Sequence, residues 1–290
     1  MRAATIDIGT DVHYVDHGGA GEPIVLVHGL GGSVENWMAC APLLAERGRV
    51  LAIDLGGFGG TRVADGKTGS VEDNRALLDR FIDEIADTPV TLVGNSMGGM
   101  ISILEATAEP DKVARLVLVD PAVPIPANAE VDPVVQFLFA TYATPGEGET
   151  FVKERLQELG PETVTRMTLE LCCVDVERIP EHVVDAHIAL SRRRVGMEWA
   201  HRAFLDAARS LMTKIAEPAY TEAIRGLQMP TLVVYGDCDR LVARQAIDAL
   251  AELRPDWRFE ILDGIGHTPM LEDPERFASV VGAWLKATTG

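Results

Sequence analysis

The sequence predicts an α/β protein with a mostly parallel sheet, because short apolar runs alternate along the chain with amphipathic stretches of helical spacing. The runs are almost continuously apolar, as expected of strands that helices cover on both faces. Residues 121–230 break the alternation and carry no comparable run, which predicts an inserted helical segment. With 290 residues, 47% of them hydrophobic and 24% charged, the chain has the composition of a compact globular protein.

The expected strands are separated by stretches long enough to hold a helix, as the connections of a parallel sheet require. Two weaker alternating runs, residues 5–8 and 12–17, predict an antiparallel hairpin at the sheet edge. Helices are expected between the later runs, where Leu77, Phe81 and Ile85 recur at helical spacing. The buried strands are expected at residues 23–27, 50–53, 90–93, 116–119 and 231–235, with a late strand at 259–262.

The inserted segment contains several helix-length stretches broken by proline or glycine, and we expect it to form a cap over the sheet. This gives a core domain of residues 1–120 and 227–290 and a helical cap of residues 121–226. The basic cluster at residues 191–195 is expected to be a solvated helix end. The cap helices are expected at residues 134–142, 151–159, 162–172, 182–192 and 198–212.

Charge and hydropathy exclude several kinds of partner. The chain has 26 Lys plus Arg against 44 Asp plus Glu, a net charge of −18, which disfavours binding to nucleic acid or to an anionic membrane surface. No apolar run is long enough to span a membrane, and no secretory signal is visible, so we expect a cytoplasmic protein. Cys40, Cys172, Cys173 and Cys238 lack metal or redox spacing and are expected to be buried or idle thiols.

The strongest local motif is the segment at residues 91–100, where an apolar strand runs into Gly94-Asn95-Ser96-Met97-Gly98 and then into a helix. A nucleophile elbow requires this order, because the sharp strand-to-helix turn exposes the serine hydroxyl and the glycines avoid Cβ clashes. The sequence therefore predicts Ser96 as a nucleophile. An ordinary serine in a glycine-rich turn is the alternative.

A second glycine-rich loop follows the apolar strand at residues 23–27. A tetrahedral intermediate requires two donors on its oxyanion, one from the residue after the nucleophile and one from a neighbouring loop. We assign these donors to the backbone N–H groups of Met97 and Leu30. Both loops are expected at the carboxyl edge of the sheet, where parallel strands end.

A serine nucleophile requires a base, and the base requires an acid that holds its tautomer. His267 lies in a loop after a late strand, and Asp239 lies in the loop after the strand at residues 231–235. The chain order Ser96, Asp239, His267 is that of sheets with this kind of elbow. Asp237 and Asp120 remain alternatives for the acid, since both also follow a strand.

These motifs resemble those of the α/β-hydrolase fold family over essentially the whole chain. The resemblance rests on HGLGG at residues 28–32, DLGGFG at 54–59, GNSMGG at 94–99, GDCDRLV at 236–242 and GHTPMLEDPERF at 266–277. It implies a mostly parallel, eight-stranded α/β-hydrolase sheet with an inserted cap, and the triad Ser96, Asp239 and His267. One departure is Gly56, where relatives usually carry proline, and we expect it to loosen its loop.

The resemblance leaves more than one reaction open. A serine at the elbow argues against the dehalogenases and epoxide hydrolases of this fold, which use aspartate. We expect a serine hydrolase that cleaves a small or medium carboxylic ester through an acyl-enzyme, without metal or organic cofactor. A carbon–carbon bond hydrolase of ring-fission products ranks second. Hydrolases of that group usually have a proline in the HG loop and an aromatic residue after the late Gly-His. This chain has Gly31-Gly32 and Thr268 at those places.

Other functions of the fold are weighed against this one. A slow-turnover ligand receptor is an alternative of a different class, and a cofactor-free peroxidase or a transacylase is also open. The expected partner is a small-molecule ester or acyl substrate, and a homodimer is left open. Aromatic cap residues are expected to supply part of the pocket, although each is more often simply cap core: Phe137, Phe139, Tyr142, Trp199 and Phe204.

Overall fold

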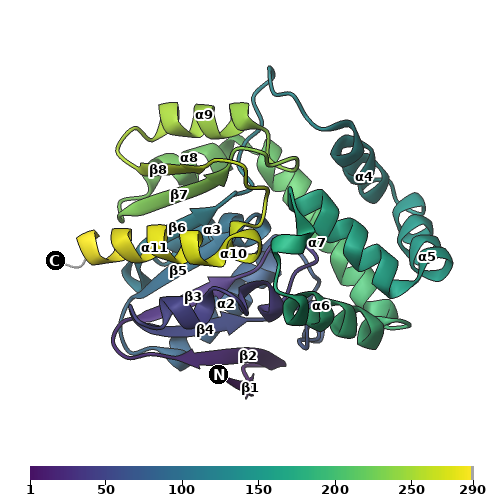
Figure 1. Cartoon of the computed structure of the whole chain (residues 1–290), viewed down its shortest axis with the longest axis horizontal. Coiled ribbons are helices and arrows are strands. Elements are labelled where there is room, and N and C mark those ends of the chain that lie inside the picture. Colours follow the sequence, from purple (N-terminus) through teal and green to yellow (C-terminus); the bar gives the residue numbers. More distant parts are fainter. Residues whose placement is uncertain (289–290) are drawn as a thin grey trace.

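An eight-stranded sheet forms the centre of the molecule (Figure 1), in a computed structural model that describes residues 1–288. Its strand order is β1-β2-β4-β3-β5-β6-β7-β8. The pairs β1–β2 and β2–β4 are antiparallel and all others are parallel, which confirms the predicted mostly parallel sheet. The strands are β1 (Arg2–Asp7), β2 (Asp11–Gly18), β3 (Pro23–Val27), β4 (Arg49–Ile53), β5 (Val90–Asn95), β6 (Val113–Val119), β7 (Thr231–Gly236) and β8 (Arg258–Leu262).

The central strands are apolar on both sides because helices cover both faces of the sheet. Every residue of β3, β5 and β7 is buried. One apolar core lies under α2 (Val71–Ile85), α3 (Met97–Ala108), α8 (Pro218–Gly226) and α9 (Arg244–Leu253). The other lies under the 3₁₀ turn η1 (Val34–Trp37), α1 (Ala41–Leu44), α10 (Pro269–Glu272) and α11 (Pro274–Thr288).

Strand register brings the candidate loops to one edge of the sheet. Val27 at the end of β3 pairs with Gly94 of β5, and Asn95 pairs with Val119 at the end of β6. The loops that follow β3, β5 and β6 therefore start at the same level. Parallel sheets hold their ligands at this carboxyl edge.

Helices α4 to α8 lie between β6 and β7 in the chain, and α4 to α7 stand beside the carboxyl edge of the sheet (Figure 1). Helices α4 to α7 cover the stretches that were expected to be helical. Helix α5 is kinked at Gly160, just before Pro161, where the sequence predicts an interruption. Helix α8 was not expected. It packs on α3, and its Tyr220 donates a hydrogen bond to the carbonyl of Ala122, in the segment after β6, 2.8 Å away. The bounds are α4 (Pro133–Ala143), α5 (Glu147–Cys172), α6 (Glu181–Arg194) and α7 (Glu198–Ala216), with η3 (Val176–Arg178) between α5 and α6.

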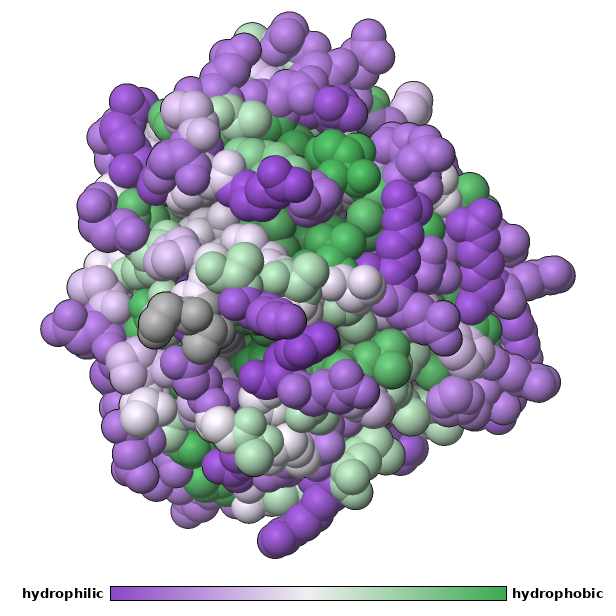
Figure 2. Space-filling view, turned by 60° about the vertical axis from the view of Figure 1, so that its left-hand side comes forward, coloured by the Kyte–Doolittle hydropathy of each residue, from purple (hydrophilic) through white to green (hydrophobic). Residues whose placement is uncertain are grey.

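The surface is rich in charge, as the composition implies. Figure 2 shows one face, on which hydrophilic residues cover most of the outline and hydrophobic ones emerge between them. Within residues 1–288, none of the helices combines the length and the hydropathy that crossing a bilayer requires.

Candidate active site

Ser96 stands at the turn between β5 and α3 with φ 53° and ψ −117°, a conformation in which a non-glycine residue is strained. Glycines permit the turn, because a Cβ on Gly94 would lie 2.4 Å from the Gly98 carbonyl oxygen. A Cβ on Gly98 would lie 2.2 Å from the carbonyl oxygen of Val27 on the neighbouring strand. The local geometry is therefore that of a nucleophile elbow.

The expected acid and base meet at the same edge. His267 Nδ1 lies 2.8 Å from Asp239 Oδ2, and their side chains are 4% and 0% exposed. The other oxygen of Asp239 accepts hydrogen bonds from the backbone N–H groups of Leu241 at 2.7 Å and Val242 at 3.1 Å. The carboxylate is thus fixed on one side and faces the imidazole on the other.

The two alternative acids have other contacts. Asp237 Oδ1 accepts from the N–H of Gly264 at 2.7 Å, so it ties two loops together away from the imidazole. Asp120 Oδ1 accepts from the N–H of Gly236 at 2.9 Å, and the carboxyl group also interacts with the carboxylate of Asp239. Asp120, Asp239 and His267 place one oxygen or nitrogen each within 4.8 Å of one another. The structure thus adds a second carboxyl group beside the pair.

The environment of Asp120 favours its protonated form. The carboxyl group is fully buried, and the nearby charge of Asp239 adds to the effect of burial, so its pKa is raised well above the ordinary value. Asp120 also has a positive φ of 44°, which among the described non-glycine residues is shared only by Ser96. The two strained positions directly follow the neighbouring strands β5 and β6.

Two elements hold the loop of His267. Asn95 Nδ2, beside the elbow, donates to the His267 carbonyl at 3.1 Å. On the other side the His267 N–H donates to the carbonyl of Cys172, at the end of α5, at 2.6 Å. The hydrogen bonds among residues 1–288 do not include one between Ser96 and the His267 ring, a contact that is often long when no substrate is bound.

Glu272 links the same loop to the segment after α5. One oxygen accepts from the N–H of Gly266 at 2.8 Å, and the other accepts from those of Val174 and Asp175, both at 3.0 Å. Its carboxylate is fully buried. Sequence reasoning missed this role, although Glu272 lies inside the quoted GHTPMLEDPERF segment.

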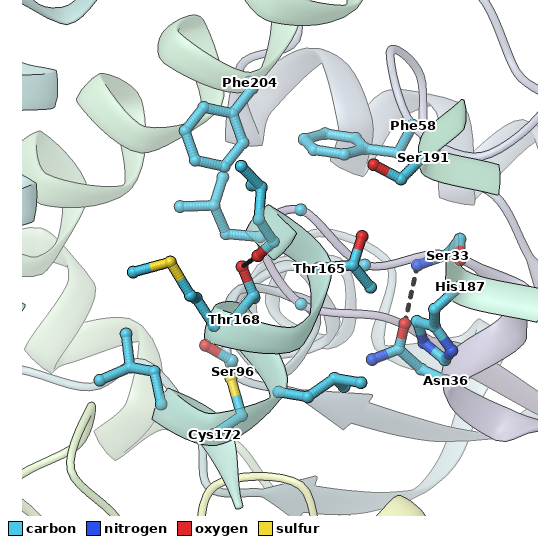
Figure 3. A pocket seen from close by; sticks show the side chains of 18 of the residues that line it. Ser33, Asn36, Phe58, Ser96, Thr165, Thr168, Cys172, His187, Ser191 and Phe204 are labelled. Atoms are coloured by element: carbon cyan, nitrogen blue, oxygen red, sulfur yellow. Dashed lines mark hydrogen bonds between the residues drawn. The ribbon is translucent and has the colours of Figure 1, made fainter. Parts of the chain in front are cut away.

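Ser96 and His267 both line a cavity of about 360 Å³ between the sheet edge and helices α4 to α7. Figure 3 shows Ser96 in this cavity together with Thr168, Cys172 and Phe204. Of the five aromatic residues expected at the pocket, Phe139, Tyr142 and Phe204 line it. Phe137 and Trp199 do not, and Phe137 is 59% exposed. Most of the remaining wall is apolar, which suits a substrate with hydrocarbon parts.

The loop after β3 lies against the elbow. A Cβ on Gly29 would lie 3.0 Å from the Cβ of Ser96, and Leu30 lines the cavity. Among the described residues, neither the N–H of Leu30 nor that of Met97 has a hydrogen-bond acceptor. Two free donors beside Ser96 fit the expected oxyanion hole, whose assignment stays a prediction.

Several polar residues near the site have structural contacts. His28 donates from Nδ1 to the Gly29 carbonyl at 2.8 Å and accepts at Nε2 from the N–H of Leu55 at 3.0 Å. Gly56 donates to Asn74 Oδ1 at 2.7 Å, a hydrogen bond that proline cannot make. This hydrogen bond anchors the loop, so the expectation that Gly56 loosens it is wrong.

The four cysteines are free thiols. Cys40 and Cys173 are buried, Cys172 lines the cavity, and Cys238 is exposed. Burial raises the pKa of Cys172 and of Cys173, which disfavours their thiolate forms. The idle role expected of them stays a prediction.

The basic cluster is solvated only in part. Arg192 and Arg193 are exposed, and they pair with Glu162 and Glu35. Arg194 is instead half-buried and donates to the carbonyl oxygens of Gly59 at 3.0 Å and Gly57 at 2.6 Å. The expectation of a solvated helix end is wrong for this residue, because it satisfies a loop at the sheet edge.

A sheet of this order, with a strained turn after its central strand, defines an α/β protein of the nucleophile-elbow type. The chain belongs to the alpha/beta hydrolase fold family, whose sequence profile matches residues 22–274. The family resemblance read from the motifs is therefore confirmed.

Curated relatives carry out more than one reaction. The chain is 28% identical to a 2-hydroxy-6-oxo-6-(2'-aminophenyl)hexa-2,4-dienoic acid hydrolase of Metapseudomonas resinovorans, over 96% of this chain and 88% of that one. It is 30% identical to a 2-hydroxymuconate semialdehyde hydrolase of a Pseudomonas species, over 92% and 88%. It is 26% identical to a pimeloyl-[acyl-carrier protein] methyl ester esterase of Aeromonas hydrophila, over 92% and 96%.

Solved structures agree on the fold. A thermophilic esterase from Thermogutta terrifontis superposes with a TM-score of 0.76 at 23% identity, with 100% of both chains covered. The structure of the protein lip1 from Acinetobacter baumannii gives a TM-score of 0.78 at 22% identity and covers 99% of this chain and 91% of that one. At this identity the likeness shows the fold alone.

Proposed function

We propose that the chain is a serine hydrolase that cleaves a small or medium carboxylic ester through an acyl-enzyme. The observation that carries the proposal is the 2.8 Å contact of His267 with Asp239 in the cavity that Ser96 also lines. A fixed acid that holds Nδ1 leaves Nε2 of the imidazole to act as a base toward serine. The apolar wall supplies room for the hydrocarbon parts of an ester.

The proposed reaction has two steps. Ser96 Oγ attacks the ester carbonyl while His267 takes the hydroxyl proton, and His267 then returns that proton to the departing alcohol. Water attacks the acyl-serine with His267 again as base, which releases the carboxylic acid and restores the serine hydroxyl. The N–H groups of Leu30 and Met97 stabilise the oxyanion of both tetrahedral intermediates.

A carbon–carbon bond hydrolase is the second candidate. The dienoic acid and muconate semialdehyde hydrolases are relatives over most of the chain, and they favour this alternative directly. The same serine, histidine and acid could serve either bond, since family membership does not determine the leaving group. A slow-turnover receptor would bind its ligand in the same cavity but would hydrolyse it and release the product only slowly.

Turnover of matched substrates separates these candidates. Wild type and Ser96→Ala are assayed with a p-nitrophenyl ester series and with a 2-hydroxy-6-oxo-dienoate. We expect rapid ester hydrolysis by wild type, reduced on the order of a millionfold in the variant. Faster cleavage of the dienoate than of every ester would establish the carbon–carbon reaction, and tight binding with negligible turnover would favour the receptor.

The remaining expectations stay predictions. The domain division at residues 121 and 226, the absence of a metal or organic cofactor, the cytoplasmic location and the homodimer each require their own measurement. The packing of α8 on α3 favours a cap that ends before α8.

A further inference from the structure

The cavity beside Ser96 has two chemically different ends. Aromatic and aliphatic side chains of α4, α5 and α7 predominate at one end, including Leu138, Phe139 and Phe204. Arg155 of α5 and His201 of α7 also line the cavity, and Arg155 lies over the ring of Phe151. Polar side chains from the region of η1 and α6 gather at the other end. Figure 3 shows Ser33, Asn36 and His187 close together there, and the ring of Phe58 beside Ser191. These polar residues are Ser33, Asn36, Thr165, His187 and Ser191. Ser33, Asn36 and His187 are together called the polar end below.

His187 presents an unused hydrogen-bond acceptor. Its Nδ1 donates to the Val183 carbonyl on its own helix at 2.8 Å, which assigns the proton to Nδ1. Nε2, at the distal edge of the ring, is buried and has no partner among the described residues. Burial lowers the pKa of His187, which favours the neutral ring with a lone pair on Nε2.

Ser33 and Asn36 supply groups of complementary kind. The Ser33 side chain is buried, and its Oγ has no partner within residues 1–288. Asn36 Oδ1 accepts from the Ser33 N–H at 2.9 Å, which turns the Nδ2 donors the other way. Helix α6 packs on η1, and Arg193 pairs with Glu35 at 3.8 Å, so His187 is held beside these two residues.

An unpaired hydrogen-bonding group in a buried place destabilises the site until a partner satisfies it. A ligand that only accepts hydrogen bonds would be repelled by the lone pair of His187. A carboxylate would also be repelled by the negative charge of Glu35, which is close enough to affect the pKa of His187. Arg194 does not supply a free cation here, because both of its Nη atoms already donate to backbone carbonyls. A group that both donates and accepts, and that carries no charge, fits all three side chains.

We propose that the polar end binds an uncharged hydroxyl group of the substrate, which makes the substrate a hydroxylated ester with an apolar remainder. The hydroxyl donates to His187 Nε2 and accepts from Asn36 Nδ2, and the Ser33 hydroxyl completes the set. This assignment rests on the proposed ester hydrolysis. It also separates the site from one that selects a carboxylate.

The test compares esters that differ in one terminal group. Each set carries a methyl, a hydroxyl or a carboxylate terminus, placed on the acyl chain in one series and on the alcohol in a second. In wild type we expect kcat/KM for the hydroxyl member to exceed that of the methyl member at least tenfold in one series. The carboxylate member is expected to be the poorest of the three.

Variants identify the residue responsible. His187→Leu is expected to lower the hydroxyl-to-methyl ratio about tenfold, whereas His182→Leu, at an exposed position on the same helix, leaves the ratio unchanged. The Ser33 hydroxyl makes no hydrogen bond to residues 1–288, so we expect Ser33→Ala to fold normally. Ser33→Ala is also expected to lower the hydroxyl-to-methyl ratio. An unchanged ratio in both His187→Leu and Ser33→Ala, or a preference for the carboxylate ester, would overturn the proposal.

A binding measurement tests hydroxyl recognition by the polar end independently of ester hydrolysis. Ketone analogues, in which a methylene group replaces the ester oxygen, cannot be hydrolysed. If wild type hydrolyses no ester, the ester proposal fails, yet at least tenfold tighter binding of the hydroxyl ketone than of the methyl ketone would still support the polar end. Equal binding of the two ketones in both series would contradict it.

Discussion

His267 Nδ1 contacts Asp239 Oδ2 at 2.8 Å, in a place where neither side chain is more than 4% exposed. A second carboxyl group, that of Asp120, lies beside this pair without a hydrogen bond to the imidazole. The proposed roles of the two carboxyl groups are therefore distinct. We propose that Asp239 orients the base, whereas burial and the charge of Asp239 favour the protonated form of Asp120 next to it.

Asparagine substitutions separate the two acids. Asp239→Asn is expected to lower kcat about ten-thousandfold, because an amide cannot hold the imidazole in its working tautomer. Asp120→Asn keeps an acceptor for the Gly236 N–H and an uncharged group beside Asp239, so its kcat should stay within about tenfold of wild type. Steady-state kinetics on folded variants checks both, and a larger loss in Asp120→Asn would reverse the assignment.

The carboxylate of Glu272 is expected to position His267 through the loop that carries it. Glu272→Gln replaces an acceptor by an amide N–H that faces backbone donors, which should lower kcat about tenfold or more and lower the melting temperature. Glu275→Gln is the matched control, because Glu275 is exposed on α11. Equal kinetics and melting temperatures in the two variants would contradict the role of Glu272.

The close packing of the elbow on β3 predicts a steric effect at Gly98. In Gly98→Ala the new Cβ would lie 2.2 Å from the Val27 carbonyl oxygen and 2.6 Å from that of His28. Because backbone must move, the free energy of unfolding should fall by about 3 kcal/mol or more. Gly226→Ala is the control, since nothing lies within 4 Å of its Cβ. Urea unfolding that gives both variants the same stability would refute this packing.

His17 is expected to make stability depend on pH. Burial, followed by the charge of the N-terminus, lowers its pKa to about 4 from 6.5, so the unfolded chain binds more protons between these values and stability falls as pH falls. Between pH 7.5 and 5.5, wild type should lose about 1 kcal/mol of unfolding free energy that His17→Gln does not lose. The exposed His182→Gln should follow wild type, whereas parallel curves for all three proteins would exclude this contribution.

Much of the sheet and its loops could be predicted from the sequence because continuous apolar runs and glycine-rich turns are local signals. The strand at residues 23–27, the predicted strand at 90–93, which extends to Asn95 in the structure, and the elbow at Ser96 are examples. Helix α8 was missed because it is short and buries only Tyr220 and Ile224, which gives a weak periodic pattern.

Contacts between distant segments had no comparable signal. The His267 N–H reaches the carbonyl of Cys172, a backbone acceptor that every residue has, so no residue type indicates it. The unpaired His187 Nε2 depends on the packing of α6 against η1, which composition does not specify. The sequence thus identified the candidate triad, whereas the polar end of the cavity required the fold.

The most direct test of the central claim is the intact mass of the protein after reaction with a fluorophosphonate, followed by peptide mapping. The account predicts one adduct, located on Ser96, and no adduct in Ser96→Ala. Because the probe reacts with an activated serine, labelling should also slow strongly in Asp239→Asn. An adduct on another residue, or equal labelling of Ser96→Ala, would contradict the claim that Ser96 is the nucleophile.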